Sequence, residues 1–347
     1  MTSTLAGFAA ATALAIVVAS CAPTVGSGPS QTVPPTSIST VPPSSAPPPT
    51  SPPAATSTVA PSPIPLPTSV QLSVPSGGIV WALVAGTRLF RSDDRGDAWL
   101  ERSLPPPATN VRISFISDRE GWLLSSGSVG TPCPVQSIKI WHTTDGAVTW
   151  SDVGTAGISE AGCKDGIDFV SPTTGFVRVA GQDQAPMLYR TTDGGRSWSP
   201  TRPLSDPPGP ARTADVRYWN GPVHVFGPVL LVTLEREATP GQTNFVYRSS
   251  DDGATWAYLA TLPYGSWPGF VTAARWVQLV VPGQSQETLD AGASWHASLA
   301  DYGQAAPILP QVEFGDPQVG YATVRGSIQR TVDGGRHWMY IVTPGTR

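Results

Sequence analysis

From Val70 to the C-terminus, short segments of alternating apolar and polar residues are separated by turns rich in glycine and aspartate. For example, Lys139-Ile140-Trp141-His142 precedes one turn and Trp150-Ser151-Asp152-Val153 follows it. A period of two is typical of strands with one buried face, and two such segments around a tight turn predict a hairpin. The pattern therefore predicts an all-β fold in which no helix of note is expected.

The hairpin turn recurs six times with the frame Ser/Thr-x-Asp-x-Gly-x-Ser/Thr-Trp, which we call the box. The boxes are Ser92-Asp93-Asp94-Arg95-Gly96-Asp97-Ala98-Trp99, Thr143-Thr144-Asp145-Gly146-Ala147-Val148-Thr149-Trp150, Thr191-Thr192-Asp193-Gly194-Gly195-Arg196-Ser197-Trp198, Ser249-Ser250-Asp251-Asp252-Gly253-Ala254-Thr255-Trp256, Thr288-Leu289-Asp290-Ala291-Gly292-Ala293-Ser294-Trp295 and Thr331-Val332-Asp333-Gly334-Gly335-Arg336-His337-Trp338. Their aspartates are 51, 48, 58, 39 and 43 residues apart. This period is typical of a four-stranded propeller blade.

The positions that recur in the frame each have a role within the turn. The aspartate can accept backbone N–H bonds, the glycine can adopt a positive φ, and the tryptophan can bury its ring between layers. Ala147 takes the glycine place in box 2, and Ala98 takes the second Ser/Thr place in box 1. We expect these two turns to be looser or differently hydrogen-bonded.

A weaker pattern of two strands precedes each box. It reads Ile113-Ser114-Phe115 with Gly121-Trp122-Leu123, Ile167-Asp168-Phe169 with Gly175-Phe176-Val177, and Val312-Glu313-Phe314 with Gly320-Tyr321-Ala322. Repeat 1 offers Val70-Gln71-Leu72 with Gly78-Ile79-Val80-Trp81, repeat 4 offers Val216-Arg217-Tyr218 with Val229-Leu230-Leu231, and repeat 5 has only a degraded version near 271–281. With one strand into the box and one out of it, each blade has four antiparallel strands.

The spacing predicts six blades, because the widest interval of 58 residues cannot hold two units when the narrowest unit takes 39. A seven-bladed ring is the alternative if residues 60–70 fold back. The chain starts at a first strand and ends at a fourth, Met339-Tyr340-Ile341-Val342. Ring closure should then depend on blade packing and, at most, one borrowed strand.

Residues 1–20 are predicted to be a signal peptide, because residues 5–20 are almost wholly apolar and small and the stretch is too short for a stable membrane span. Val18-Ala19-Ser20-Cys21 resembles the lipobox of bacterial lipoproteins. This resemblance implies lipidation (palmitate) of Cys21, a mature chain that begins there, and a location on the extracytoplasmic face of the cell membrane. The first charged residue is Arg88, so the leader lacks a basic n-region and the true start codon stays open.

Residues 21–69 are predicted to be a disordered linker, and residues 70–347 the propeller. Residues 22–69 hold 15 prolines and 18 serines or threonines without a charged or aromatic side chain. Such a segment cannot bury enough apolar area to offset chain ordering, and its proline favours an extended stalk. The Thr/Ser/Pro composition is also common among O-glycosylated stalks.

Composition limits the partners and the cysteine chemistry. The net charge is −4 and the only lysines are Lys139 and Lys164, which argues against nucleic-acid binding. With Cys21 lipidated, Cys133 and Cys163 remain as a pair outside the reducing cytoplasm and predict a disulfide. The alternative, a metal-binding or nucleophilic thiol, lacks a neighbouring ligand at suitable spacing.

With these repeats the chain resembles the BNR or Asp-box propellers, and it is most similar to their photosystem II assembly-factor-like branch. The match covers nearly everything from Val70 onward. The resemblance implies that the boxes lie at the blade periphery and that their aspartates are structural: Asp94, Asp145, Asp193, Asp251, Asp290 and Asp333. The same repeat occurs in sialidases, glucan-cleaving hydrolases, sorting receptors and assembly factors, so it indicates a fold rather than an activity.

A sialidase-like or other glycoside hydrolase is the alternative hypothesis. A sialidase-type site needs three arginines, a tyrosine nucleophile with a glutamate base, and an acid. The family's Arg-Ile/Leu-Pro signature is missing before the first box, and Tyr218 with Glu235 is the best remaining pair. We therefore expect no catalytic residue and no cofactor. No metal is expected either, because the four histidines, His142, His224, His296 and His337, stand in different repeats.

The sequence favours a monomeric binding or assembly scaffold for an envelope protein or glycan partner. Loops with blade-specific sequences near 125–137, 205–212, 236–244 and 262–269 are where specificity would reside. The aromatic residues outside the boxes that could form a contact patch are Trp219, Tyr264, Trp267, Trp276 and Tyr302, with core packing favoured for Trp276.

Overall fold

The computed structural model describes residues 62–106, 108–127, 135–182, 186–209, 216–237, 241–280, 284–303 and 310–346. The predicted signal peptide, Cys21, the linker up to residue 61 and Cys133 lie outside the described residues. Ala60–Arg347 forms one compact unit. The described part of the chain contains no helix that could span a membrane.

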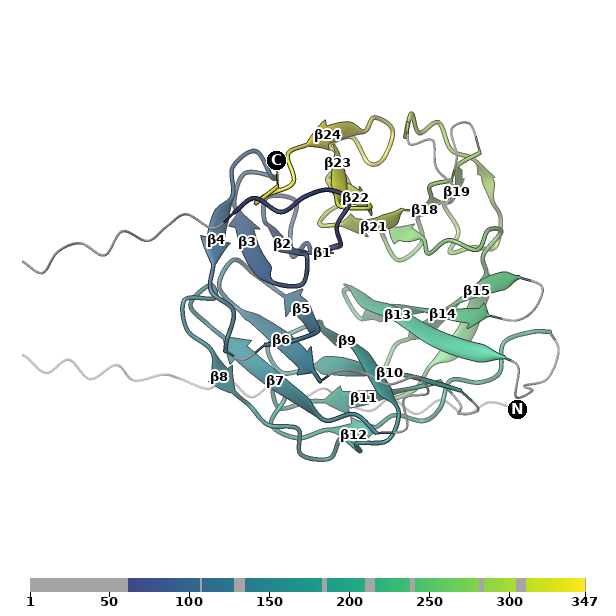
Figure 1. Ribbon diagram of the computed structural model, residues 1–347. Coiled ribbons are helices and arrows are strands. Elements are labelled where there is room, and N and C mark those ends of the chain that lie inside the picture. Colours follow the sequence, from purple (N-terminus) through teal and green to yellow (C-terminus); the bar gives the residue numbers. More distant parts are fainter. Residues whose placement is uncertain are drawn as a thin grey trace, which may run out of the picture. The chain divides into compact units, whose positions relative to one another are not determined.

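The fold is a six-bladed β-propeller of four-stranded antiparallel blades, as the box spacing predicts. In Figure 1 the first strands that carry a label lie near the centre of the ring, and the labelled fourth strands lie at its rim. The strands of blades 1 to 3 are β1 (Val70–Ser73), β2 (Val80–Val84), β3 (Arg88–Ser92), β4 (Leu100–Arg102), β5 (Val111–Phe115), β6 (Gly121–Ser126), β7 (Ile138–Thr143), β8 (Ser151–Asp152), β9 (Cys163–Phe169), β10 (Gly175–Gln182), β11 (Met187–Thr191) and β12 (Ser199–Pro200). Those of blades 4 to 6 are β13 (Arg217–Phe226), β14 (Val229–Glu237), β15 (Gln242–Ser249), β16 (Ala257–Thr261), β17 (Gly269–Phe270), β18 (Trp276–Gln278), β19 (Gln286–Thr288), β20 (His296–Ala297), β21 (Gln311–Phe314), β22 (Gly320–Val324), β23 (Ser327–Thr331) and β24 (Met339–Ile341).

The pattern of phenylalanine followed by glycine forms a stack between blades. Phe115 pairs with Gly121, and a Cβ on that glycine would lie 2.1 Å from the Phe115 ring. Trp81 of blade 1 stacks on Phe115 of blade 2 with ring centroids 3.7 Å apart, and Trp122 stacks on Phe169 at 3.6 Å. The Phe115 ring lies over its cross-strand partner Gly121. Because the stacked rings fill the space between blades, a larger side chain at that position would clash with the phenylalanine ring.

The ring closes without a shared strand among the described residues, since β1–β4 and β21–β24 form separate sheets. A core that includes Val80 and Tyr321 joins these two blades. Arg330 of the last blade donates to the Arg95 carbonyl and to Asp97 of the first, both at 2.7 Å. In the described part of the segment before β1, residues 62–69, Ile64 forms a single-residue bridge with Thr346, and these residues add no strand of a seventh blade.

Blade 4 has longer inner strands than the segments that the sequence predicted for it. Its inner strand β13 has ten residues, and a bulge lies between Asn220 and Val223. Leu230 and Leu231 pair with Val225 and His224, whereas Arg217 and Tyr218 pair with Glu237 and Arg236 at the other end of the two strands. The two predicted segments thus fall in neighbouring strands, and the length of β13 and its bulge are features that the sequence did not predict.

Blades 3 and 4 are joined and blade 5 is short. Gly181 and Gln182 at the end of β10 pair with Tyr218 and Arg217 of β13, which links both blades in one eight-stranded sheet. In blade 5, β17 has only two residues, in agreement with the degraded repeat. The junction between blades 3 and 4 and the short inner strand of blade 5 position the side chains of the candidate site.

Candidate functional site

The box aspartates lie in turns between the third and fourth strands, at the rim of the ring (Figure 1). In box 3, the Thr191 hydroxyl donates to Asp193 Oδ1 (2.8 Å) and accepts the Gly195 N–H (3.0 Å), while the Ser197 hydroxyl donates to Asp193 Oδ2 (2.6 Å). The side-chain bond from Ser197 is the main cause of an Asp193 pKa lowered to about 2. Both carboxylate oxygens are therefore occupied within the turn.

The other boxes repeat this bonding with two exceptions. Box 1 lacks the bond to Oδ2 because Ala98 has no hydroxyl, although its N–H still donates to Asp94 Oδ1 at 2.9 Å. In box 6 His337 Nδ1 contacts Asp333 Oδ2 instead. Box 2 is not looser, since Ala147 adopts a φ of 63° and its N–H donates to Thr143 Oγ1 at 3.0 Å. The expectation of altered bonding thus holds for box 1 and fails for box 2.

A polar cluster that the sequence did not predict lies at the centre of the ring. Matching the register of the six blades shows one equivalent position on the inner strands, occupied by Ser73, Ser114, Asp168, His224, Gly269 and Glu313. In blades 1 and 2 this residue binds the next inner strand: Phe115 N–H donates to Ser73 Oγ and Phe169 N–H to Ser114 Oγ, both at 2.8 Å. We call the set from blades 3, 4 and 6, together with Arg178, the axial cluster.

Arg178 reaches this cluster from the second strand of blade 3. Its Nε lies 3.1 Å from Asp168 Oδ2, and its Nη1 donates to the Asn220 carbonyl at 3.1 Å. A Cβ at Gly166 would lie 1.8 Å from Arg178 Nη2, so only glycine lets the guanidinium cross the inner strand. Arg178 thus joins the inner ends of blades 3 and 4.

His224 and Glu313 meet across the short blade 5, with His224 Nδ1 3.7 Å from Glu313 Oε2. Burial, reinforced by Asp168, raises the Glu313 pKa to about 8, and burial with Arg178 lowers the His224 pKa to about 4. At neutral pH both groups are therefore uncharged. The contact between His224 and Glu313 is then not an ion pair, although the two atoms are close enough to form one. Burial also raises the Asp168 pKa to about 6, so this group is ionised beside Arg178 at neutral pH.

Three of the four predicted specificity loops adjoin blade 4, and the fourth, 125–137, is the β6–β7 hairpin of blade 2. All four follow a second or a fourth strand, so their described residues lie at the end of the ring opposite the boxes, which we call the loop end. Of these loops, 128–134, 210–215 and 238–240 lie outside the described residues.

At the loop end, a carboxylate lies between aromatic side chains. Trp219 pairs with Glu235, and Glu235 pairs with Asn244, so the three side chains share one face of blade 4. Trp267 Nε1 donates to Glu235 Oε2 at 3.0 Å, and the Trp267 ring packs over Gly221. We call Trp219, Glu235 and Trp267 the loop-end patch. Both indoles are half-buried, and burial raises the Glu235 pKa.

The loop that carries Trp267 is anchored from two sides. Gln278 Nε2 donates to the Ser266 carbonyl at 2.6 Å, and Gln242 Nε2 donates to the Gly265 carbonyl at 2.8 Å. Beneath it, the fully buried Asn244 amide has neither its nitrogen nor its oxygen hydrogen-bonded within the described residues. A buried polar group left unpaired in this way is energetically costly.

The other aromatic candidates are placed differently. Tyr264 is half-buried in the same loop, whereas Trp276 is fully buried and lies edge-on to Phe270. Tyr302 is also buried and lies edge-on to Trp338, so it belongs to the core rather than to a contact patch.

The proposed nucleophile pair of a sialidase is not brought together. Tyr218 is buried in the core between blades 3 and 4 and is not a surface residue. It pairs with Arg236, so it lies on the face of the sheet opposite to Glu235. Among the described residues, no group of three or more His, Cys, Asp or Glu side chains could hold a metal ion.

No family model and no curated protein matches the sequence, whereas solved structures share its fold. A protein of unknown function from Dyadobacter fermentans DSM 18053 is 13% identical over 80% of this chain and 95% of its own, with a TM-score of 0.50. YCF48 bound to a D1 peptide is 17% identical over 80% and 82% (TM-score 0.46), and Hadza microbial sialidase Hz136 is 12% identical over 80% and 66% (TM-score 0.48). At these identities the likeness concerns the propeller fold alone.

Proposed function

We propose that the protein is a non-catalytic cell-envelope lipoprotein whose monomeric propeller serves as a binding or assembly scaffold for a protein or glycan partner at the loop end. The observation that carries this proposal is the loop-end patch, two half-buried indoles around one carboxylate. Tryptophan offers a large, rigid contact area and recurs at the energetic centres of interfaces.

The chemistry of the patch suits a partner that presents a cation. A half-buried carboxylate attracts an ammonium or guanidinium group, and indole faces attract the same groups through their π electrons. The Trp267 N–H donates to Glu235 Oε2, and Oε1 makes no hydrogen bond among the described residues, so it can accept one from a partner. In this proposal Cys21 carries the lipid and the linker holds the propeller away from the membrane surface.

The scaffold proposal is tested by affinity purification of the full-length protein from its native envelope. A stable partner should co-purify with the wild type, be lost with Trp219→Ala, and be retained with Val148→Ala, which changes an exposed side chain of box 2. Thermal denaturation of each variant shows that the folds are comparable. Equal recovery of the partner with both variants would refute recognition at the loop end.

A glycoside hydrolase is the second candidate, and the axial cluster is the observation that favours it. A protonated Glu313 near an ionised Asp168 is the charge arrangement of a general acid and its partner carboxylate. The decisive assay is hydrolysis of a panel of fluorogenic sialosides and glucans. Turnover abolished by Glu313→Gln would establish the hydrolase and displace the scaffold proposal.

A further inference from the structure

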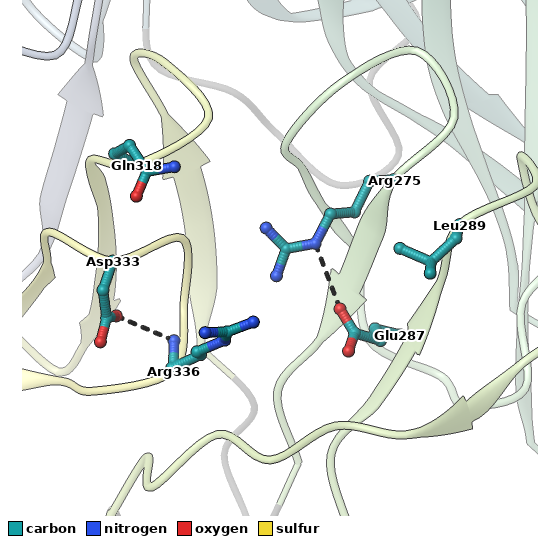
Figure 2. Close-up of a pocket in the computed structure, with 6 residues that line it drawn as sticks. All are labelled: Arg275, Glu287, Leu289, Gln318, Asp333 and Arg336. Carbon is teal, nitrogen blue, oxygen red and sulfur yellow. Dashed lines mark hydrogen bonds and ion pairs between the residues drawn. The ribbon is translucent and has the colours of Figure 1, made fainter.

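A second polar site lies at the box end of the ring, between blades 5 and 6. It is a pocket of about 270 Å³ lined by Arg275, Glu287, Leu289, Gln318, Asp333 and Arg336 (Figure 2). The first three residues come from blade 5 and the last three from blade 6. The proposed scaffold function uses none of these residues.

Arg275 holds blade 5 against blade 6 in an unusual way. In blades 1, 3 and 6 the residue before the box is an arginine, Arg91, Arg190 or Arg330, that donates to a backbone carbonyl of the next blade. Blade 5 has Glu287 at this place, and Arg275 from the preceding turn makes the bond, with Nη2 2.7 Å from the Gly334 carbonyl. Glu287 Oε2 accepts from Arg275 Nε at 3.2 Å. This exchange places a carboxylate and a guanidinium on the wall of the pocket.

Arg336 supplies a second guanidinium from the opposite wall. Figure 2 shows its side chain extending toward Arg275, and its guanidinium has no hydrogen-bond partner among the described residues. Box 3 has the same Asp-Gly-Gly-Arg sequence, yet Arg196 Nη1 there folds back to the Asp193 carbonyl at 3.2 Å. Two like charges that face each other are stabilised when an anion lies between them.

The remaining lining restricts the charge of that anion. Asp333 directs Oδ1 toward the backbone N–H groups of Arg336 (3.1 Å) and His337 (2.9 Å), and its Oδ2 contacts the His337 ring. Glu287 contacts both Arg275 and His296: its Oε2 accepts from Arg275 Nε, and its Oε1 lies 3.5 Å from His296 Nε2. With two carboxylates in the wall, a doubly charged anion is repelled more strongly than a singly charged one.

The lining also suits hydroxyl groups and one apolar surface. Glu287 can accept a hydroxyl hydrogen, and the Gln318 amide can donate or accept. Leu289 is 59% exposed and offers an apolar wall to a ring face. A volume of about 270 Å³ lies just below the range of drug-sized sites and fits a single sugar ring.

We propose that this pocket binds a uronic-acid sugar unit, with its carboxylate between Arg275 and Arg336 and its hydroxyl groups on Glu287 and Gln318. The carboxylate matches the planar N–H edges of guanidinium groups. This site is independent of the loop-end patch, so either proposal can fail without the other.

The test is ligand-observed NMR titration of the full-length protein with glucuronate, with glucose as the neutral analogue and sulfate as the doubly charged anion. Glucuronate should bind in the millimolar range, and both glucose and sulfate at least tenfold more weakly. The variant Arg336→Ser should weaken glucuronate binding at least fivefold. The matched variant Arg196→Ser in box 3 should leave it unchanged.

Three results would overturn the proposal. They are the absence of glucuronate binding, binding of sulfate as tight as that of glucuronate, and equal glucuronate affinity in Arg336→Ser and Arg196→Ser. Arg336 is exposed, so circular dichroism should show both variants folded. The readout is then the occupancy of the pocket rather than the integrity of the ring.

Discussion

His224 of blade 4 lies 3.7 Å from Glu313 of blade 6, although blade 5 separates their strands in sequence. This approach depends on the short inner strand of blade 5, where Gly269 takes the equivalent position. A Cβ at Gly269 would lie 2.4 Å from Val312 Cγ1. The centre of the ring is therefore closed by blades 4 and 6 across a glycine.

Gly269→Ala should destabilise the fold by about 1–3 kcal/mol, because the added methyl group is forced into the packed Val312 side chain. The measurement is urea denaturation followed by tryptophan fluorescence. Gly78→Ala is the matched control, since a Cβ there meets nothing within 4 Å, and it should be nearly neutral. Equal stability of the two variants would show that blades 5 and 6 can separate at little cost.

The free energy of unfolding should fall as pH rises from about 6.5 to 8. Folded Glu313 holds its proton up to about pH 8, whereas the unfolded chain releases it near the ordinary carboxyl value of 4.5. The folded state therefore binds more protons in this window, and raising the pH favours unfolding. Glu313→Gln should remove this pH dependence of the free energy of unfolding above pH 6.5. The other carboxyl group with a raised pKa, Asp168 at about 6, affects the free energy of unfolding only below that pH.

The pH curve has two informative controls. Glu160→Gln, at an exposed position, should keep the slope of the wild type. His224 contributes in the opposite direction, because its lowered pKa makes stability fall as pH drops from about 6.5 to 4. A Glu313→Gln curve parallel to the wild type above pH 6.5 would contradict the assigned state of Glu313.

Asp193→Ala should lower the melting temperature without changing partner binding, because Asp193 is bonded only within its own turn. Asp94→Ala should lower it less, since Ala98 leaves Asp94 Oδ2 without the hydroxyl bond that Ser197 gives to Asp193. Differential scanning calorimetry of both variants measures this order. A larger effect at Asp94, or loss of partner binding with an unchanged melting temperature, would contradict a structural role for the boxes.

Cys133 and Cys163 should be joined in protein purified from the native envelope. The bridge between Val135 and Ala161 supports this disulfide, because these residues lie two positions after Cys133 and two before Cys163. In the chain-entropy model, closing this loop contributes roughly 3–4 kcal/mol. Non-reducing mass spectrometry is the measurement, and two free thiols would remove the prediction.

Radiolabelled palmitate should be incorporated by the wild-type chain and lost in Cys21→Ala, because the thiol of Cys21 is the predicted acceptor of the lipid. The matched change Ser20→Ala keeps the cysteine and should retain the label. Labelling that persists without Cys21 would disprove this anchor site.

The sequence predicted the parts of the fold that depend on local chemistry. All six box turns form where the frame places them, since their hydrogen bonds join residues no more than four positions apart. The recurrence of phenylalanine and glycine likewise predicted the inner hairpins, because Phe115 and Gly121 lie in one blade. Spacing alone then gave the number of blades.

The axial cluster could not be predicted in the same way. Asp168 and Glu313 occupy the same position in two repeats, and the sequence shows this equivalence. Their proximity in space, however, depends on the closure of the ring. His224 was not recognised as the equivalent of Asp168 and Glu313, because it follows a bulge late in the long strand β13. Arg178 comes from a second strand and reaches the centre only over Gly166. These contacts join distant segments, so no local pattern records them.

We propose that the boxes stabilise the turns at the rim of the ring while the loop end recognises the partner. A photo-crosslinking amino acid at position 267 or at position 148 of the full-length protein in its native envelope separates these two roles. Adducts with one partner should form from position 267 and none from position 148. Adducts from position 148 alone would place recognition at the box end and contradict the proposal.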